Sequence, residues 1–361
     1  MTISVNLESI VHNALAIKGY CKGAKLCAMV KADAYGHGLL EVARSLESVC
    51  DFLGVARMEE ARALREGDIG EKILVCSDLL YEAIGYAVEN GVTLTASSAQ
   101  EIEVLAEQAK EKRRPQSVHI KVDSGMNRLG VKSLKELSSM IRNLKKAPFV
   151  QLEGIYTHFA DCTDQEFTDE QFKRFMCFVD AARQTFPEII AHCASSAAIF
   201  ADRKYHLDMV RPGINLYGYL REGAQNRGVL LRPAMQVFSG VIAVKRARKG
   251  ESVGYSRTYV APEEITYAVV GAGYGDGLKR ALSNKGKVAI GGRLCDVIGN
   301  ICMDAFMARI AGGAMPGDEV LLFSDEAQEE LSFEHNSALC GTICYELLTS
   351  FTARAKREYV K

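Results

Sequence analysis

The sequence lacks an excess of charge of either sign and lacks any long apolar segment. Lysine and arginine number 44 and aspartate and glutamate 45, so no basic surface for nucleic acid or anionic membrane is indicated. No run approaches the ~20 apolar residues that span a bilayer. The first residues, MTISVNLESIVHNALAIKGY, lack the basic and then apolar order of a signal peptide. These absences predict a soluble cytoplasmic protein with neither a nucleic-acid nor a membrane partner.

Cysteine pairs at C-x-x-C spacing and proline-rich linkers are also missing. The eleven cysteines are an odd number, and several lie inside apolar runs, such as Cys27 in LCAMV and Cys76 in ILVCS. This pattern predicts reduced, buried thiols rather than a disulfide framework or a metal site. The length of 361 residues suggests about two domains. Because no repeat or low-complexity linker separates them, we expect the two to pack against each other.

Short apolar runs alternate with amphipathic stretches over the first 220 residues. The runs are apolar without strict alternation, which favours strands buried on both faces of a parallel sheet. A helical stretch such as SAQEIEVLAEQAKEKR begins with a plausible N-cap, Ser98, followed by Glu101. No glycine fingerprint for a doubly wound fold follows the first run. The sequence therefore predicts an N-terminal (β/α)8 TIM barrel over residues 1–230, with strands at 25–31, 52–56, 72–77, 93–97, 118–123, 152–159, 190–196 and 209–218.

The sequence pattern changes after residue 230, where short runs typical of β-strands are separated by glycine-containing turns. Helical periodicity is weak until GTICYELLTSFTARA, residues 341–355. This pattern predicts a C-terminal, mostly antiparallel β domain over residues 231–361. The first few residues of the chain are candidates to pair with that domain.

Ionisable and hydroxyl side chains lie at or shortly after the ends of five of the predicted barrel strands, where TIM barrels carry their chemistry. A serine after the seventh strand and free backbone N–H groups after the eighth would suit a phosphate. A lysine amine across the same opening suggests a Schiff base with pyridoxal phosphate (PLP). The residues concerned are Lys31, Lys121, Arg128, His158, Ser195, Ser196, Arg211, Gly213 and Ile214.

Motifs spread over the whole chain resemble one family. They occur in this order: VKADAYGHG, HIKVDSGMNRLG, YTHFADC, HCASSAA, MVRPGINLYG, SVGYSRTY, GYGDGLKRAL, GNICMD and TICYELLT. By these motifs the chain resembles the alanine racemases, which are fold-type III PLP enzymes. The resemblance implies PLP as the cofactor and the interconversion of L-alanine and D-alanine as the reaction. It also implies that the D-alanine is supplied for peptidoglycan.

The resemblance further implies roles for individual residues. Lys31 would hold PLP and act as the base on one face of the substrate, and Tyr255 would act as the base on the other. A free phenol has a pKa near ~10, so positive charge from a network containing His158 and Arg211 would favour its anionic form. Arg211 would also face the pyridine nitrogen of the cofactor. The phosphate would be held by Tyr35, Ser196, Gly213, Ile214 and Tyr345.

Other implied roles concern the substrate and its access. Arg128 would contact both cofactor and substrate, and the backbone N–H of Met303 would meet the substrate carboxylate. Tyr274 and Asp304 would line the entry channel. Lys121, a buried cation facing Arg128, would be carbamylated, although unmodified relatives also exist. Because Tyr255 and Met303 come from the other subunit in this family, we expect a head-to-tail homodimer with shared sites.

Two residues depart from the family pattern and leave substrate preference open. Ser195 stands where many relatives have asparagine, and Gly275 stands where alanine is common. The alternatives are a racemase that prefers serine or accepts a broader range of amino acids, a PLP-dependent decarboxylase of basic amino acids, and a PLP-binding protein without catalytic function. The decarboxylases lack the GYSRTY tyrosine, and the binding proteins lack a β domain.

Overall fold

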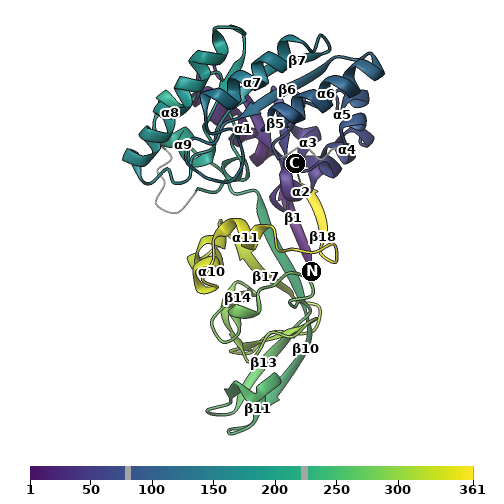
Figure 1. The fold of residues 1–361 in the computed structure, drawn as a ribbon. Helices are drawn as coiled ribbons and strands as arrows, with labels where there is room; N and C mark the ends of the chain where they lie inside the picture. The colour runs from purple at the N-terminus through teal and green to yellow at the C-terminus, as the bar shows by residue number, and fades with distance from the viewer. Residues whose placement is uncertain (78–82, 221–226, 361) are drawn as a thin grey trace. The chain divides into compact units, whose positions relative to one another are not determined.

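The computed structural model describes residues 1–77, 83–220 and 227–360 (Figure 1). By contacts the chain divides into two compact units. One, here called the barrel unit, contains residues 9–34 and 39–232. The other, here called the β unit, contains residues 1–8, 35–38 and 233–361.

The barrel unit is built on eight parallel strands. They form two four-stranded sheets, in the orders β4-β3-β2-β9 and β5-β6-β7-β8. Single parallel bridges, Leu74 to Thr93 and Ser195 to Arg211, join the sheets at both edges and close the barrel. The prediction of a TIM barrel is confirmed, with strands β2 (Lys25–Met29), β3 (Phe52–Val55), β4 (Ile73–Val75), β5 (Leu94–Ala96), β6 (Gln116–Lys121), β7 (Val150–Tyr156), β8 (Ile190–His192) and β9 (Met209–Val210).

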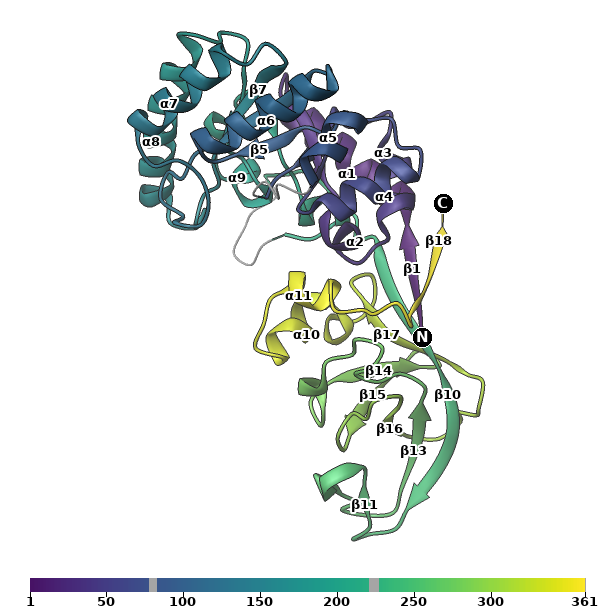
Figure 2. The ribbon, with the colours of Figure 1, turned by 45° about the vertical axis from the view of Figure 1, so that its right-hand side comes forward.

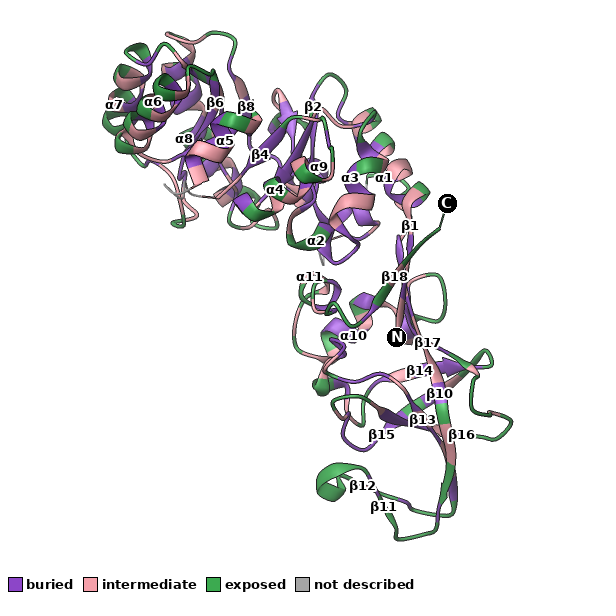
Figure 3. Cartoon of the chain, turned by 90° about the vertical axis from the view of Figure 1, so that its right-hand side faces the viewer, coloured by how far each residue is buried: buried purple, intermediate pink, exposed green. Residues whose placement is uncertain are grey.

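Helices follow the barrel strands and cover them, with buried inner and exposed outer faces (Figure 3). The predicted N-cap is confirmed, since the Ser98 hydroxyl accepts a hydrogen bond from the Glu101 N–H in a capping box. A second capping box, formed by Ser133 and Glu136, begins the helix that follows β6. The helices are α1 (Leu7–Tyr20), α3 (Leu39–Leu46), α4 (Met58–Glu66), α5 (Ile84–Asn90), α6 (Ala99–Lys112), α7 (Leu134–Lys145), α8 (Gln165–Arg183) and α9 (Ser196–Ala201). Among the described residues, no helix has both the length and the apolar character needed to cross a membrane.

The β unit is an eight-stranded sheet in the order β13-β16-β15-β14-β17-β10-β1-β18, in which β10 also pairs with β13 (Figure 2). All its pairings are antiparallel except that of β1 with β18. A small hairpin, β11 with β12, extends it. The elements are β1 (Thr2–Asn6), β10 (Met235–Ala247), β11 (Ser252–Val253), β12 (Tyr259–Val260), β13 (Ile265–Val270), β14 (Lys287–Ile290), β15 (Arg293–Ile298), β16 (Phe306–Ile310), β17 (Glu319–Ser324), α10 (Phe333–Leu339), α11 (Cys344–Leu348) and β18 (Lys356–Val360).

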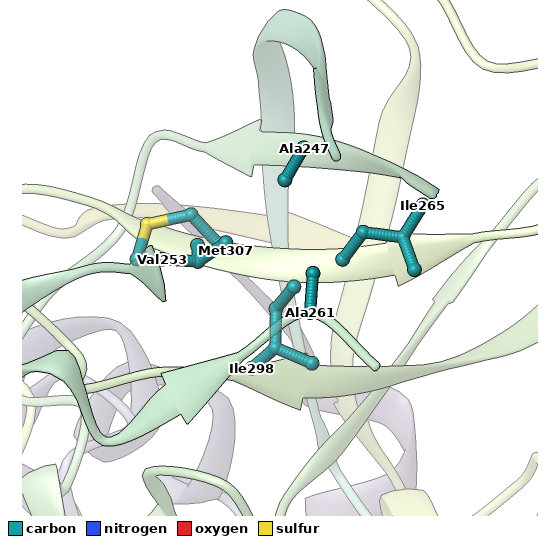
Figure 4. Packing of buried hydrophobic residues seen from close by; sticks show 6 residues of the cluster. All are labelled: Ala247, Val253, Ala261, Ile265, Ile298 and Met307. Carbon is teal, nitrogen blue, oxygen red and sulfur yellow. The ribbon is translucent and has the colours of Figure 1, made fainter. Parts of the chain in front are cut away.

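A buried apolar cluster ties the hairpin to the main sheet of the β unit. Side chains from β10, β13, β15 and β16 meet those of β11 and of the residue after β12 (Figure 4). Burial of such side chains stabilises the fold by roughly 25 cal/mol per Å² of apolar surface. The cluster consists of Ala247, Val253, Ala261, Ile265, Ile298 and Met307.

Several element boundaries differ from the sequence-based expectations. The run 209–218 forms only a two-residue strand, because Pro212 and Gly213 follow it and a 3-10 turn, η3 (Ile214–Tyr217), begins. The helical pattern at 341–355 yields only α11, and the chain then returns as β18. Lys31 does not end a strand, since β2 stops at Met29. All eleven cysteines are free, as predicted, but only Cys21, Cys27, Cys193 and Cys295 are buried, and Cys177 is exposed.

Candidate active site

Four basic side chains lie at the carboxyl ends of the barrel strands or in the loops that follow them. Lys31 follows β2, Lys121 is the last residue of β6, Arg211 follows β9, and Arg128 lies between β6 and α7. His158 lies two residues after β7, and all four side chains affect its pKa. Burial holds the pKa of His158 well below its ordinary value, and Lys121, Arg211, Arg128 and Lys31 lower it further. The structure therefore brings these five predicted residues within electrostatic reach of one another.

Arg211 is buried, and acceptors at the ends of two strands, β7 and β8, fix its guanidinium. Its Nη1 donates to His192 Nδ1 at 2.7 Å. Its Nη2 lies 2.8 Å from the Thr157 carbonyl, 3.4 Å from that of Cys193 and 3.5 Å from His158 Nδ1. Because a guanidinium can only donate, His192 and His158 must present unprotonated Nδ1 atoms to it. The expected contact between His158 and Arg211 is present.

Lys121 is a buried amine facing aromatic and cationic neighbours. Its Nζ lies 4.1 Å from the centroid of the Tyr156 ring, which Arg211 also faces. Within the described residues no carboxylate forms an ion pair with Lys121. Burial, followed by Arg211 and then Arg128, holds the pKa of Lys121 well below its ordinary value. The unprotonated amine, which is the nucleophilic form, is therefore favoured at this position.

The loops after β8 and β9 form a cradle of hydrogen-bond donors. The Gly213 N–H donates to Ser196 Oγ at 2.8 Å, and Asn215 Nδ2 donates to the Ser196 carbonyl at 3.1 Å. Ile214 begins η3, and the first N–H groups of a helical turn have no acceptor within the turn. Backbone N–H groups and a hydroxyl, with basic side chains in the same unit, are a donor set that fits a phosphate-bearing cofactor such as PLP.

Lys31 begins a left-handed turn, α2 (Lys31–Tyr35). The φ angles of the four residues after Lys31 lie between 52° and 55°. Left-handed conformation costs roughly 1–2 kcal/mol per residue without glycine, so the turn must be held by its contacts. The Ala32 N–H donates to Glu60 Oε1 at 2.6 Å, and Asp33 Oδ1 accepts from the Leu39 N–H at 2.8 Å. This turn could not be predicted from the sequence, because Asp33 is the only residue of KADAY that tolerates positive φ well.

The remaining predicted residues belong to the β unit. The rings of Tyr35 and Tyr345 lie 6.1 Å apart, centroid to centroid. Tyr255, Met303 and Tyr274 are 71%, 52% and 44% exposed, which is unusual for side chains of this size. Asn300 Nδ2 donates to the Tyr255 carbonyl at 2.9 Å and so anchors the turn η4 (Tyr255–Arg257).

Asp304, the predicted entry residue, is neutralised by Arg354. Arg354 Nη2 donates to Asp304 Oδ1 at 2.8 Å, and its Nε lies 3.2 Å from Asp276 Oδ1. A Cβ atom on Gly275 would lie 2.3 Å from Arg354 Nη1 and 3.0 Å from the Met303 carbonyl oxygen. The glycine that departs from the family pattern thus provides the space in which this arginine binds both carboxylates.

We expect Gly275→Ala to displace the Arg354 guanidinium and break its ion pair with Asp304. Unfolding should become easier by only about 1–2 kcal/mol, because half-exposed ion pairs contribute little and the clash is with the end of a flexible side chain. In a double-mutant cycle with Asp304→Asn, the effects on KM for alanine should be strongly non-additive. Gly271→Ala, whose Cβ would meet only Ile242 Cγ2 within 3.3 Å, is the control. Additive effects would show that Gly275 does not act through this pair.

Sequence reasoning missed His119, His192 and Glu153, which lie in line from Arg211 into the barrel interior. Both histidines are fully buried on apolar strands, β6 and β8, and were present in the quoted motifs without attracting a role. The only available signal was their position inside runs that otherwise carry apolar residues. Such histidines are more often satisfied core residues than functional ones.

Comparison with known proteins decides the family. The model of the alanine racemase N-terminal domain matches residues 5–221, and that of the alanine racemase C-terminal domain matches residues 234–359. The chain belongs to the alanine racemase family. A curated alanine racemase from Desulforamulus reducens is 37% identical over 99% of this chain and 98% of its own.

Solved structures of alanine racemases share the whole fold. The enzyme from Clostridium difficile 630, in complex with cycloserine, has a TM-score of 0.91 and 34% identity over 99% of this chain and 95% of its own. The enzyme from Bartonella henselae, with covalently bound pyridoxal phosphate, has a TM-score of 0.89 and 27% identity over 99% of both chains. Membership of the family places this chain among isomerases that racemise alanine.

Proposed function

We propose that this protein interconverts L-alanine and D-alanine with PLP by a two-base mechanism and supplies D-alanine for peptidoglycan. The observation that carries the proposal is the set of basic side chains around His158 at the carboxyl ends of the barrel strands, together with the fixed guanidinium of Arg211. The relative with covalently bound pyridoxal phosphate supports the choice of cofactor. When bound, PLP supplies an electron-withdrawing ring that stabilises negative charge on the α-carbon of an amino acid.

The chain's own residues would position the cofactor and move protons. Lys31 holds it covalently, and Ser196 with the N–H groups of Gly213 and Ile214 binds its phosphate, assisted by Tyr35 and Tyr345. Arg211, fixed by four acceptors, would donate to the pyridine nitrogen of the cofactor. Because a guanidinium stays protonated, it leaves that nitrogen unprotonated, which weakens the ring as an electron sink and disfavours transamination.

Two bases on opposite faces of the α-carbon account for racemisation. Lys31 would take or return the proton on one face once its amine is no longer bound to the cofactor, and the Tyr255 oxygen would do so on the other. The Met303 N–H would bind the substrate carboxylate, and Arg128 would contact both the substrate and the cofactor. Tyr255 is exposed in this chain and, as in the family, would serve the site of a partner subunit, which makes a homodimer the active form.

The experiment that tests the proposal is an assay of all twenty L-amino acids for conversion to their D forms, with carbon dioxide release followed in parallel. Alanine is expected to give the highest kcat/KM. A higher value for serine would favour the alternative of a serine-preferring or broader racemase, to which the Ser195 and Gly275 departures draw attention. Loss of carbon dioxide from lysine or ornithine would identify a decarboxylase and overturn the proposal.

Lys121 is expected to carry a carbamate. Its unprotonated amine would attack carbon dioxide, forming an N–C bond and releasing one proton, and the resulting anion would pair with Arg128. Protein produced with 13C-bicarbonate should show a carbamate carbonyl signal in its 13C NMR spectrum. The signal should disappear in Lys121→Ala and persist in Lys132→Ala, where an exposed lysine is removed. A parent enzyme without the signal would belong with the unmodified relatives.

A further inference from the structure

A line of buried polar side chains crosses the barrel interior, starting at Arg211. Arg211 Nη1 lies 2.7 Å from His192 Nδ1, and His192 Nε2 lies 2.8 Å from His119 Nδ1. His119 Nε2 in turn lies 3.5 Å from Glu153 Oε2. Arg211, His192 and His119 are all buried, and the Glu153 side chain is 9% exposed. We call this line the histidine relay.

The chemistry of its two ends assigns every proton in the relay. Arg211 can only donate, so His192 Nδ1 must accept and His192 carries its proton on Nε2. That Nε2–H then donates to His119 Nδ1, so His119 also carries its proton on Nε2. The His119 Nε2–H faces Glu153, which can only accept when ionised. A cation at one end and an anion at the other thus select the same neutral tautomer in both imidazoles.

Charge and burial agree with this assignment. Burial holds the pKa of His192 well below its ordinary value, aided by Arg211, and burial also lowers the pKa of His119. Burial alone would raise the pKa of Glu153, but contacts with His119 and Lys72 lower it to about 2. At neutral pH the two imidazoles are therefore uncharged and the carboxyl is ionised.

The surrounding strands are shaped to hold the relay. Tyr156 stacks on His192, with centroids 4.8 Å apart and an interplanar angle of 6°. A Cβ atom on Gly154 would lie 2.6 Å from His119 Cε1, so the glycine leaves room for that ring. Glu153 is fixed by Lys72 Nζ at 2.5 Å and by the Thr93 hydroxyl at 3.1 Å. Lys72 and Thr93 directly precede β4 and β5, so Glu153 faces the amino end of the barrel, opposite the cations.

We propose that Glu153 is a positioning residue for racemisation, acting on Arg211 through the fixed tautomers of His119 and His192. Its charge makes each imidazole a better acceptor for the next donor, and this holds the guanidinium where it meets the cofactor. The inference rests on the proposed function for its kinetic consequence, but the tautomers can be observed without any substrate.

The first arm of the test is solid-state 15N NMR of protein labelled on histidine. The chain has seven histidines, and His119→Gln and His192→Gln variants assign the two relay signals. Both residues are expected to be neutral and protonated on Nε2. A cationic ring, or protonation on Nδ1, in the parent protein would overturn the proposal even if no Glu153 variant folded.

The second arm compares Glu153→Gln with Asp208→Asn. Asp208 also pairs with a cation, Arg183 at 2.5 Å, and lies just before β9, but it does not contact the relay. An amide offers both donor and acceptor, so Glu153→Gln should give a mixture of His119 tautomers. It should lower kcat about tenfold with KM changed less than about twofold, as loss of an orienting outer partner does at metal sites. Transaminated by-product should rise relative to racemised alanine.

Each outcome of the second arm has one meaning. Asp208→Asn should leave the His119 and His192 signals and the product ratio at parent values. Equal kinetic effects of the two variants, or a Glu153→Gln protein with mixed tautomers and unchanged kcat, would reduce the relay to a structural role and overturn the proposal. A parent protein that fails to racemise alanine at all would refute the proposed function instead, while the NMR arm would still report on the relay.

Discussion

Replacing Lys31 by alanine is expected to abolish both covalent retention of PLP and racemisation. The change removes the attachment amine and one of the two bases together, so kcat/KM for alanine should fall by at least about 10³-fold. The measurement is reduction with borohydride, followed by mass spectrometry of the peptide that contains Lys31. The parent protein should carry reduced PLP on that peptide, and the variant should carry none.

Lys25→Ala is the matched control for this result. Lys25 is the exposed first residue of β2, the same strand that leads to Lys31, and it lies at the opposite end. Its removal should leave both labelling and rate near those of the parent. Covalent PLP on another lysine of the Lys31→Ala protein would show that the attachment site has been misassigned.

Complementation between two inactive variants should restore about a quarter of the parent activity. Lys31→Ala and Tyr255→Phe homodimers each lack one base in both sites, so Lys31→Ala should lose at least about 10³-fold in rate and Tyr255→Phe about 10²–10⁴-fold. If Tyr255 serves the partner subunit, a mixed dimer has one site without either base and one site with both. Random exchange makes about half of the dimers mixed, each with one working site of two.

The exchange must be verified before the recovered rate is interpreted. Native mass spectrometry of the mixture gives the fraction of mixed dimers, and each variant incubated alone gives the background. Recovery in proportion to the mixed fraction is the expected result. Complete exchange without recovered activity would place Lys31 and Tyr255 of one site in the same chain.

Local patterns in the sequence were sufficient to predict the barrel. Most of its eight strands lie in apolar runs bounded by turn residues, and a capping box such as Ser98 with Glu101 marks where the next helix begins. Parallel strands also place their carboxyl ends together, which is why Lys121, Arg211 and His158 could be assigned to one site before their contacts were known.

Features that depend on distant partners could not be predicted in the same way. β18 forms only because β1, more than 340 residues earlier, pairs with it in parallel, and nothing local in KREYV indicates this. The left-handed turn after Lys31 is likewise held by Glu60 on α4 rather than by its own sequence. The histidine relay was missed because it forms only where β6, β7 and β8 lie side by side in the right register. Hydrophobic periodicity along the chain carries no information about that register.

The path of the chain has a consequence for dissecting this protein. The two compact units exchange chain at residues 8, 34, 38 and 232, whereas the two family models meet between residues 221 and 234. A fragment ending at 232 would therefore carry β1 without β10 and β18, its two sheet neighbours. Its unpaired edges would invite association with other chains. The two matched ranges are therefore not independent folding units, and fragments for separate study should keep the first eight residues with the C-terminal part.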